Sequence, residues 1–427
     1  MKRVALVAGH FTPGNLASVH RARLWARHLG EFGWEPTIVT THYRHYEEPP
    51  DWDLDALVAR DLRVIRTRAL PLGPVRLIGD IGLRALPFHH RALARLARQG
   101  EMDFLHITIP SNYAALLGRL IHGRYGVPYG IDYIDPWVGE WPGTDVRFSR
   151  MWASAQLARR LEPWAVRDAA LITGVAPLYY EDVLARNPHL RTQAVTAAMP
   201  YGGSALDFSM VEAQNRPTTL FDATDGNVHI VYAGAMLPRA YAVLERLFEA
   251  VRLARSRYPE LAARLRMHFV GTGKSPTDPH GHNVLPYVER FGLGQVVFEH
   301  PARVPYVDVL NHLRQSSGVL VLGSTERHYT PSKAFQAVLS RKPVFAVLHD
   351  ASTAAAFLRD AHAGTVTTFD EGRLPPVEAL ADALEVFVLR PDYAPDRVNW
   401  AVCEAHSARA SAKALAAALD EVLARRR

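Results

Sequence analysis

Residues 330–348 read TPSKAFQAVLSRKPVFAVL, and this stretch combines a helix with a strand. Thr330 can cap a helix, and Pro331 suits its first turn, where the missing N–H is not needed. Apolar residues then recur at helical spacing, and Val344 to Leu348 forms a short apolar run typical of a buried strand. We therefore expect a helix that leads directly into a strand of a parallel sheet.

Helix formation alone does not explain Ser332 and Lys333 at the start of this helix. Free backbone N–H groups, a hydroxyl and an ammonium together make a site for an anion. An ordinary capped helix with a solvated lysine explains the same residues equally well. The local sequence leaves both interpretations open.

Short apolar runs alternate with amphipathic stretches along the rest of the chain, which is typical of α/β folds with parallel sheets. The chain breaks this pattern at 209–227, which is rich in polar residues and turn formers. We predict strands at Val4–Ala8, Thr37–Thr40, Leu62–Ile65, Phe104–Thr108, Pro128–Ile134, Ala170–Thr173, near Val195, and at Val228–Ala233, Met267–Val270, Val296–Glu299, Val319–Leu322 and Val344–Leu348.

The pattern predicts two Rossmann-like lobes, as the length of 427 residues also favours. The first lobe is expected at 1–208, a linker at 209–227 and the second lobe at 228–395. Residues 396–427 form an Ala/Arg/Glu-rich helical tail, which we expect to pack back on the first lobe.

Composition limits the classes of protein to consider. The chain has 48% hydrophobic and 22% charged residues, a formal net charge of +6 and one cysteine, which fits a folded protein of a reducing compartment. The apolar run after Met1 is too short for a signal peptide, and no run is long enough to span a membrane. We expect a cytoplasmic protein. Its basic charge suits anionic small molecules or an anionic membrane better than nucleic acid, for which no motif is present.

Two motifs resemble functional sites but do not qualify. GTGKS at 271–275 lacks the first glycine of a P-loop, because His268 stands there. His280 and His282 have no further metal ligand nearby in the sequence, so a surface loop is the better interpretation.

Polar residues gather where predicted strands end, on the side where ligands bind in such folds. Gly14 follows the first strand and Arg239 follows the first strand of the second lobe, while Asp132 and Asp135 end the strand at 128–134. We expect a cleft between the lobes. One wall would carry Gly14, His106, Asp132 and Asp135, and the other Arg239, Lys274, Ser332 and Lys333.

Residues 76–98 contain apolar residues among arginines and histidines. They fit either a partly exposed helical pair of the first lobe or a surface that contacts an anionic membrane.

The chain resembles GT-B-fold glycosyltransferases of or near family 4, of the kind found in bacterial polysaccharide synthesis. The resemblance covers nearly the whole chain and rests on the order of its motifs. These are DYIDPW at 132–137, LEPWAVRDAALITGV at 161–175, MPYGGSALDF at 199–208, YAGAMLPR at 232–239, MHFVGTGK at 267–274 and PSKAFQAVLSRKPV at 331–344.

The resemblance implies transfer of a sugar from a nucleoside diphosphate to an acceptor hydroxyl, with retention of configuration and without a metal or other cofactor. The acceptor is expected to be a saccharide or lipid-linked saccharide, with peripheral contact to the inner membrane face. The same resemblance implies that the donor diphosphate is bound by Gly14, Arg239, Lys333, Ser332 and Lys274. It implies that the donor sugar and ribose are bound by Gln336, Glu326, His328 and Thr330. The expected catalytic residues are Asp135, Asp132 and His106.

The chain departs from the family pattern at the paired glutamates. Gln336 occupies the second acid position and His328 the position eight residues earlier, while Thr108 stands where the family histidine is expected, just after His106. Two alternatives therefore stay open. One is a catalytically idle GT-B subunit that binds a nucleotide or a partner, and the other is a sugar-nucleotide epimerase.

Overall fold

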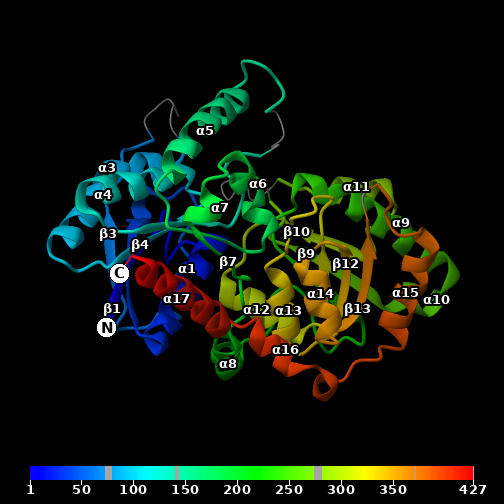
Figure 1. The fold of residues 1–427 in the computed structure, drawn as a ribbon. Helices are drawn as coiled ribbons and strands as arrows, with labels where there is room; N and C mark the ends of the chain where they lie inside the picture. Colours follow the sequence, from blue (N-terminus) through cyan, green and yellow to red (C-terminus); the bar gives the residue numbers. More distant parts are fainter. Residues whose placement is uncertain (73–78, 140–143, 274–280, 371, 427) are drawn as a thin grey trace. The chain divides into compact units, whose positions relative to one another are not determined.

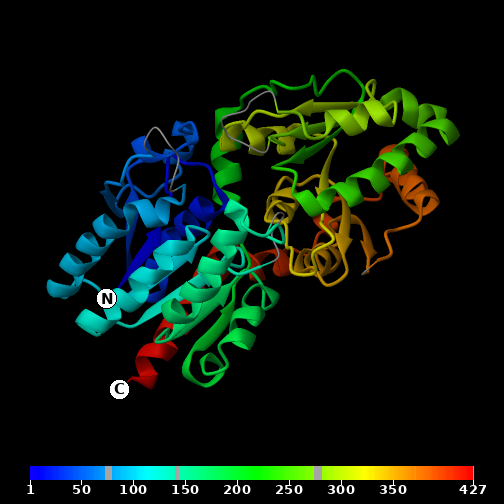
Figure 2. The ribbon, with the colours of Figure 1, turned by 90° about the horizontal axis from the view of Figure 1, so that it is seen from above.

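The chain forms two α/β units in the computed structural model, which describes residues 1–72, 79–139, 144–273, 281–370 and 372–426. The first unit comprises Met1–Gly202 and Ala408–Arg427, and the second comprises Gly203–Ser407. Both ends of the chain therefore belong to the first unit (Figures 1 and 2).

The first unit is built on a parallel sheet in the order β3-β2-β1-β4-β5-β6-β7. Its inner strands are mostly buried, as expected where helices cover a parallel sheet, whereas the edge strands at each end of the order are only partly buried. The strands are β1 (Lys2–Ala8), β2 (Trp34–Thr41), β3 (Arg63–Thr67), β4 (Phe104–Ile109), β5 (Tyr129–Tyr133), β6 (Leu171–Gly174) and β7 (Val195–Ala198).

Helices follow most of these strands and bury their apolar faces on the sheet. They are α1 (Ala17–His28), α2 (Trp52–Asp55), α3 (Ile81–Arg98), α4 (Leu116–Tyr125), α5 (Arg150–Val166), α6 (Leu178–Arg186), α7 (Leu190–Gln193) and α17 (Ala408–Arg425), with short 3-10 turns η1 (Leu29–Phe32), η2 (Tyr43–His45) and η3 (Asn112–Ala115).

The second unit repeats this plan with the order β10-β9-β8-β11-β12-β13, again all parallel. Its strands are β8 (Val228–Ala233), β9 (Leu265–Val270), β10 (Val297–His300), β11 (Gly318–Leu322), β12 (Val344–His349) and β13 (Gly364–Phe369).

Helices cover this second sheet, with α15 packed beside α9 (Figure 1). The helical elements are α8 (Ala205–Gln214), η4 (Pro238–Ala240), α9 (Tyr241–Arg257), α10 (Pro259–Arg264), α11 (Leu285–Arg290), α12 (Tyr306–Gln315), α13 (Lys333–Leu339), α14 (Thr353–Asp360), α15 (Val377–Leu389), η5 (Pro395–Arg397) and α16 (Trp400–Ala405).

Each sheet reverses its strand order next to its first strand, between β1 and β4 in the first unit and between β8 and β11 in the second. In open α/β sheets, ligands bind outside the carboxyl ends of the strands at this point of reversal. The loops that follow β1, β4, β8 and β11 are therefore the first places to search for a site.

The two predicted parallel sheets are confirmed, but one strand was missed. β13 reads GTVTTF, and within it only Phe369 is buried. Because an edge strand is only partly covered, β13 needs no continuous apolar run, and the sequence pattern used to find the other strands does not detect it.

The junction between the units differs from the predicted linker at its start. α8 covers Ala205–Gln214, so the first residues of 209–227 are helical. The side chain of Ser204 accepts a hydrogen bond from the Asp207 N–H and caps this helix. Such a cap favours helix formation even in a polar stretch.

The last helix, α17, packs against α1 of the first unit (Figure 1). The Trp25 indole N–H donates to Ser411 Oγ at 2.8 Å, and the Trp34 indole N–H donates to Asp420 at 2.7 Å. The preceding helix α16 belongs to the second unit. The predicted tail at 396–427 is thus shared between the units, with the boundary at Ala408.

Within the part of the chain that the structure describes, no helix combines the length and apolar content that a membrane span requires.

Candidate active site

The second unit brings together polar groups from the loops that follow β8 and β11. Thr325 N–H donates to the Arg239 carbonyl at 3.1 Å, and the Arg239 guanidinium lies 3.9 Å from the Glu326 carboxylate. These contacts join two loops that are far apart in sequence. Arg239 remains exposed, so its guanidinium stays accessible to a ligand at the point where the strand order reverses.

Lys333 is the first residue of α13, and its ammonium is excluded from solvent. The Nζ atom lies 3.7 Å from the centre of the Tyr232 ring and has no hydrogen-bond partner among the described residues. Burial lowers the pKa of Lys333 from its ordinary value to about 7. A cation–π contact offsets part of the cost of this burial, but no carboxylate among the described residues neutralises the charge.

The turn after β8 leaves room for this lysine. Gly234 adopts a positive φ of 130°, and a Cβ atom there would lie 3.1 Å from Lys333 Nζ. A larger residue would therefore be strained and would crowd the ammonium. The backbone conformation and the nearby ammonium thus explain why glycine stands at this position of the YAGAMLPR motif.

A second unsatisfied group lies on the same short helix. Gln336 Oε1 is buried and lacks a hydrogen-bond partner among the described residues. Residues three apart lie on the same side of a helix, so Gln336 and Lys333 share one face of α13. A buried donor and a buried acceptor without partners are costly, and a polar ligand can satisfy both.

The predicted helix cap at Thr330 is wrong. α13 begins only at Lys333, its N-cap residue is Ser332, and no side chain caps it. Thr330 is buried instead, with its hydroxyl 2.9 Å from that of Thr353, while Ser352 donates to the Tyr329 carbonyl. These contacts with the start of α14 hold the TP segment in a non-helical path.

The remaining predicted residues of the second lobe are placed as follows. Ser332 and His328 are half-buried, and Glu326 accepts a hydrogen bond from the Ser324 hydroxyl. Lys274 and His280 lie outside the described residues. His282, interpreted as a loop residue, lies 3.2 Å from Glu299.

In the first unit, Asp132 is fully buried at the end of β5 and is held by three hydrogen bonds. Arg21 donates to its two oxygens at 2.6 and 2.8 Å, and the Thr173 hydroxyl donates at 2.8 Å. Arg21 also donates to the Met199 carbonyl. Because both oxygens of Asp132 are bound and neither reaches solvent, this carboxylate fastens α1 to β5 and cannot contact an acceptor here.

His106 lies in β4 and is also fully buried. Its ring packs near that of Trp25, and its Nε2 lies 3.5 Å from the Thr173 hydroxyl. Burial lowers the pKa of His106 to about 4, so the imidazole is neutral at physiological pH. The structure therefore places His106 in the interior of the unit, beside the Asp132 network.

Asp135 and Gly14 lie nearer the carboxyl edge of the sheet. Asp135 is half-buried, just after β5, so its carboxylate has some access to solvent. The N–H of Gly14 donates to the Phe11 carbonyl at 2.9 Å, which closes a tight turn. That N–H is therefore engaged within the loop.

The sequence reasoning missed a polar pair beside this turn. His10 follows β1 directly, and its Nε2 lies 3.6 Å from the Glu48 carboxylate. The His10 ring also packs against Tyr46, whose hydroxyl accepts from the Phe11 N–H. The position of His10 directly after a predicted strand could have identified it as a candidate. Glu48 could not be found in this way, because it lies in an irregular loop whose path no sequence pattern reveals.

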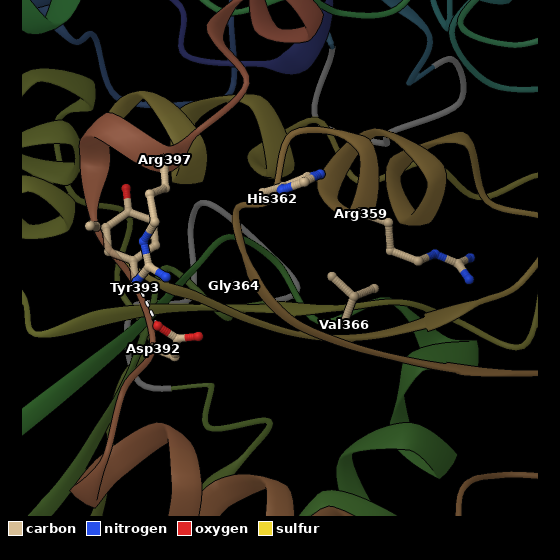
Figure 3. A pocket seen from close by; sticks show the side chains of 8 residues that line it. Arg359, His362, Gly364, Val366, Asp392, Tyr393 and Arg397 are labelled. Atoms are coloured by element: carbon tan, nitrogen blue, oxygen red, sulfur yellow. Dashed lines mark hydrogen bonds and ion pairs between the residues drawn. The ribbon is translucent and has the colours of Figure 1, made fainter.

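A separate hollow of about 480 Å³ lies at the amino end of β13 (Figure 3). Ligands of parallel sheets bind at the carboxyl ends of the strands, whereas this hollow lies at the amino end of one strand. None of the predicted site residues lines it. It is lined by Arg359, His362, Gly364, Val366, Asp392, Tyr393, Ala394 and Arg397.

Comparison with known families agrees with this architecture. The family model for the glycosyl transferase 4-like domain matches residues 18–202, which span most of the first unit. Residues 18–202 are similar to a glycosyl transferase 4-like domain. The resemblance drawn from the motif order is thereby confirmed. A comparison with curated proteins finds no match.

Several solved structures are similar to this chain over its whole length. HepE from Anabaena, in complex with UDP and glucose, is 14% identical, with 100% of this chain and 99% of that chain covered and a TM-score of 0.58. Trehalose 6-phosphate synthase from Burkholderia multivorans is 14% identical, with 100% and 97% covered and a TM-score of 0.60. A putative UDP-N-acetylglucosamine 2-epimerase from Listeria monocytogenes is 14% identical, with 100% and 98% covered and a TM-score of 0.55. The chain has the GT-B fold.

We expect the Arg21→Met variant to lose about 3–5 kcal/mol of unfolding free energy, because Asp132 would be left as a buried, unpaired charge. The Arg21→Met/Asp132→Leu double variant should recover most of this loss. Chemical denaturation measures both changes. If Asp132 instead faced solvent as a catalytic group, the single variant would unfold like the wild type.

Lys333→Met should stabilise the protein most at and below neutral pH. The folded pKa of about 7 lies below the usual value of 10.5, so the unfolded chain binds more protons between these values. Wild-type stability should therefore rise with pH across this window, and the advantage of Lys333→Met should shrink as the pH approaches 10.

Denaturation at pH 6.5, 8 and 9.5 measures this difference, with the exposed Lys413→Met as control. An advantage that stays constant with pH would show that the Lys333 ammonium is solvated.

Proposed function

We propose that this protein is a glycosyltransferase that moves a sugar from a nucleoside diphosphate to an acceptor hydroxyl. The second unit binds the donor and the first unit binds the acceptor. The glycosyl transferase 4-like domain and the GT-B fold support the reaction class. The proposed donor site is the group of residues after β8 and β11.

One observation carries the assignment of the donor site, namely the solvent-excluded Lys333 ammonium, which has no counter-charge in the part of the chain that the structure describes. A bound diphosphate would supply that charge, and its approach would raise the pKa of Lys333 again. The exposed Arg239 guanidinium lies on the neighbouring loop and suits a second contact with the same anion. Ser332 precedes Lys333 and adds a hydroxyl donor.

The proposed mechanism depends on how charge develops during transfer. Breaking the anomeric C–O bond builds negative charge on the departing diphosphate and positive charge on the sugar. Lys333 and Arg239 stabilise the diphosphate more strongly as the bond breaks, which accelerates the step. Asp135 orients the acceptor hydroxyl and accepts its proton. Asp132, being bound to Arg21, positions β5 instead.

The sugar and the ribose contact residues that differ from the family pattern. Gln336 Oε1 is unsatisfied and suits a ribose hydroxyl, to which a carboxylate would bind in the family pattern. Glu326, His328 and Thr330 lie in the loop before α13, where they limit the space for the donor sugar.

HepE is seen with UDP and with UDP-glucose, which makes UDP the first donor base to test. The proposal further includes retention of configuration, charge stabilisation by protein cations without a metal, and a role in cell-surface polysaccharide or glycolipid assembly. We place the protein in the cytoplasm, in peripheral contact with the inner face of the membrane.

Two other functions compete with this proposal. A catalytically idle nucleotide-binding subunit is favoured by Gln336 in place of an acid. A sugar-nucleotide epimerase is favoured by the shared fold of the Listeria protein. Transfer requires an acceptor, whereas neither alternative does, so the need for an acceptor separates the transferase from both alternatives.

We expect UDP at 100 times its dissociation constant to stabilise the wild type by about 2.7 kcal/mol. Lys333→Met should abolish this stabilisation, because the ammonium that pairs with the diphosphate is gone. Thermal unfolding with UDP, GDP, dTDP and ADP measures the effect. Lys342→Met provides a matched control, since Lys342 is a half-buried lysine of the same segment and should respond like the wild type.

Release of free UDP from a UDP-sugar then distinguishes the functions. A transferase releases UDP only when an acceptor is supplied, and Asp135→Asn should slow that release at least about 100-fold. Stabilisation by UDP without acceptor-dependent release would favour the idle subunit. Interconversion of the sugar without an acceptor would favour the epimerase.

A further inference from the structure

The buried residues of helix α5 all lie in its carboxyl-terminal half. Its buried residues are Ala158, Glu162, Ala165 and Val166, and none of residues 150–157 is buried. The amino-terminal half accordingly extends away from the sheet of the unit (Figure 1). Within this half, Ser154 hydrogen-bonds Tyr113 of the same unit, so the contacts with the unit are polar and no apolar side chain is buried.

Apolar side chains gather at the end of this projection, in residues 146–152, which we call the α5 tip. Val146, Phe148 and Met151 are 57%, 88% and 48% exposed. The Phe148 ring packs against that of Trp152 in a tilted arrangement, with ring centres 5.4 Å apart. Scattered exposed apolar residues are ordinary, but a cluster of this kind marks an interaction site.

The backbone of the α5 tip holds Phe148 outward under strain. Phe148 has a φ of 64°, a left-handed conformation that bulky residues rarely adopt. The Ser149 hydroxyl accepts from the Trp152 N–H and caps α5 directly after it. Such strain is retained mainly where it serves a function.

Charge identifies the kind of partner. Residues 146–160 contain Arg147, Arg150, Arg159 and Arg160 and no acidic residue. Aromatic side chains flanked by arginines suit the boundary between lipid headgroups and acyl chains, where the rings are buried and the guanidinium groups meet anionic headgroups.

We propose that the α5 tip inserts into the surface of an anionic lipid bilayer. The proposal rests on the proposed function in one respect, because it makes the acceptor of the first unit a lipid-linked saccharide. It also places the membrane contact on a different element from the one that the sequence suggested.

That other element, α3, is bound to the unit by its apolar face. Leu93 and Leu96 are buried in the core, and the exposed side chains include Arg91, Arg95 and Arg98. α3 therefore exposes charge, and none of its large apolar side chains is as exposed as those of the α5 tip. Residues 76–78 of the predicted interfacial stretch lie outside the described residues.

The test is sedimentation of the full-length protein with vesicles of phosphatidylglycerol and phosphatidylcholine, without nucleotide. Phe148→Ser/Met151→Ser should lower the partition coefficient at least about tenfold, because two apolar side chains no longer insert. Arg147→Gln should lower it about fivefold at low salt, and the effect should fade at high salt. Pure phosphatidylcholine should bind weakly.

Leu178→Ser on α6 is the matched control, because Leu178 is also exposed, at 40%, on the same unit. It should bind vesicles like the wild type, and all variants should keep the wild-type melting temperature. Arg91→Gln/Arg95→Gln removes charge from α3 and should weaken binding less than the Phe148→Ser/Met151→Ser change.

Three results would overturn the proposal. The wild type fails to sediment with anionic vesicles, or the α3 variant loses binding while the tip variant retains it. In the third, the wild type binds no vesicles and is a dimer, which the Phe148→Ser/Met151→Ser change converts to a monomer. The α5 tip would then join two copies of the chain. Because no turnover is measured, each outcome is independent of UDP release, which tests the proposed function separately.

Discussion

The ammonium group of Lys333 lies out of contact with solvent, and the residues that the structure describes give it space but no counter-charge. Gly234 leaves space for it, and the Tyr232 ring faces it. Tyr232 is itself held by a hydrogen bond from its hydroxyl to the Ala235 carbonyl. A buried cation without a partner is unfavourable in the folded protein. An anionic ligand that relieves this cost gains binding energy from an arrangement that already exists.

The two units share one topology but use the same edge of the sheet differently. In the first unit, Asp132, Arg21 and Thr173 form a buried network in which each oxygen of the carboxylate has a donor. A network of this kind fixes structure, since nothing in it is left for a ligand. In the second unit, Lys333 and Gln336 lack partners among the described residues. Lys333 therefore offers a ligand a charge that the described residues leave unpaired, whereas Asp132 does not.

Much of the fold follows from the sequence, because buried parallel strands need continuous apolar runs and β8, β11 and β12 show them clearly. β13 was missed since an edge strand of glycine, threonine and valine is covered only in part. The helix cap at Thr330 was mispredicted because Thr353 and Ser352, more than twenty residues later, determine the path of the chain there. Sequence spacing identified Lys333 but not its burial, and it assigned Asp132 to catalysis because Arg21 lies 111 residues away and gives no local signal.

The most direct test of the account is the number of protons taken up when UDP binds at pH 8. Isothermal titration in buffers of different ionisation enthalpy measures this number. At pH 8 the free protein should hold Lys333 mostly neutral, and a bound diphosphate should restore its charge. The account predicts uptake of nearly one proton per UDP, lost in Lys333→Met. Tight UDP binding without proton uptake, or with equal uptake in Lys333→Met, would contradict it.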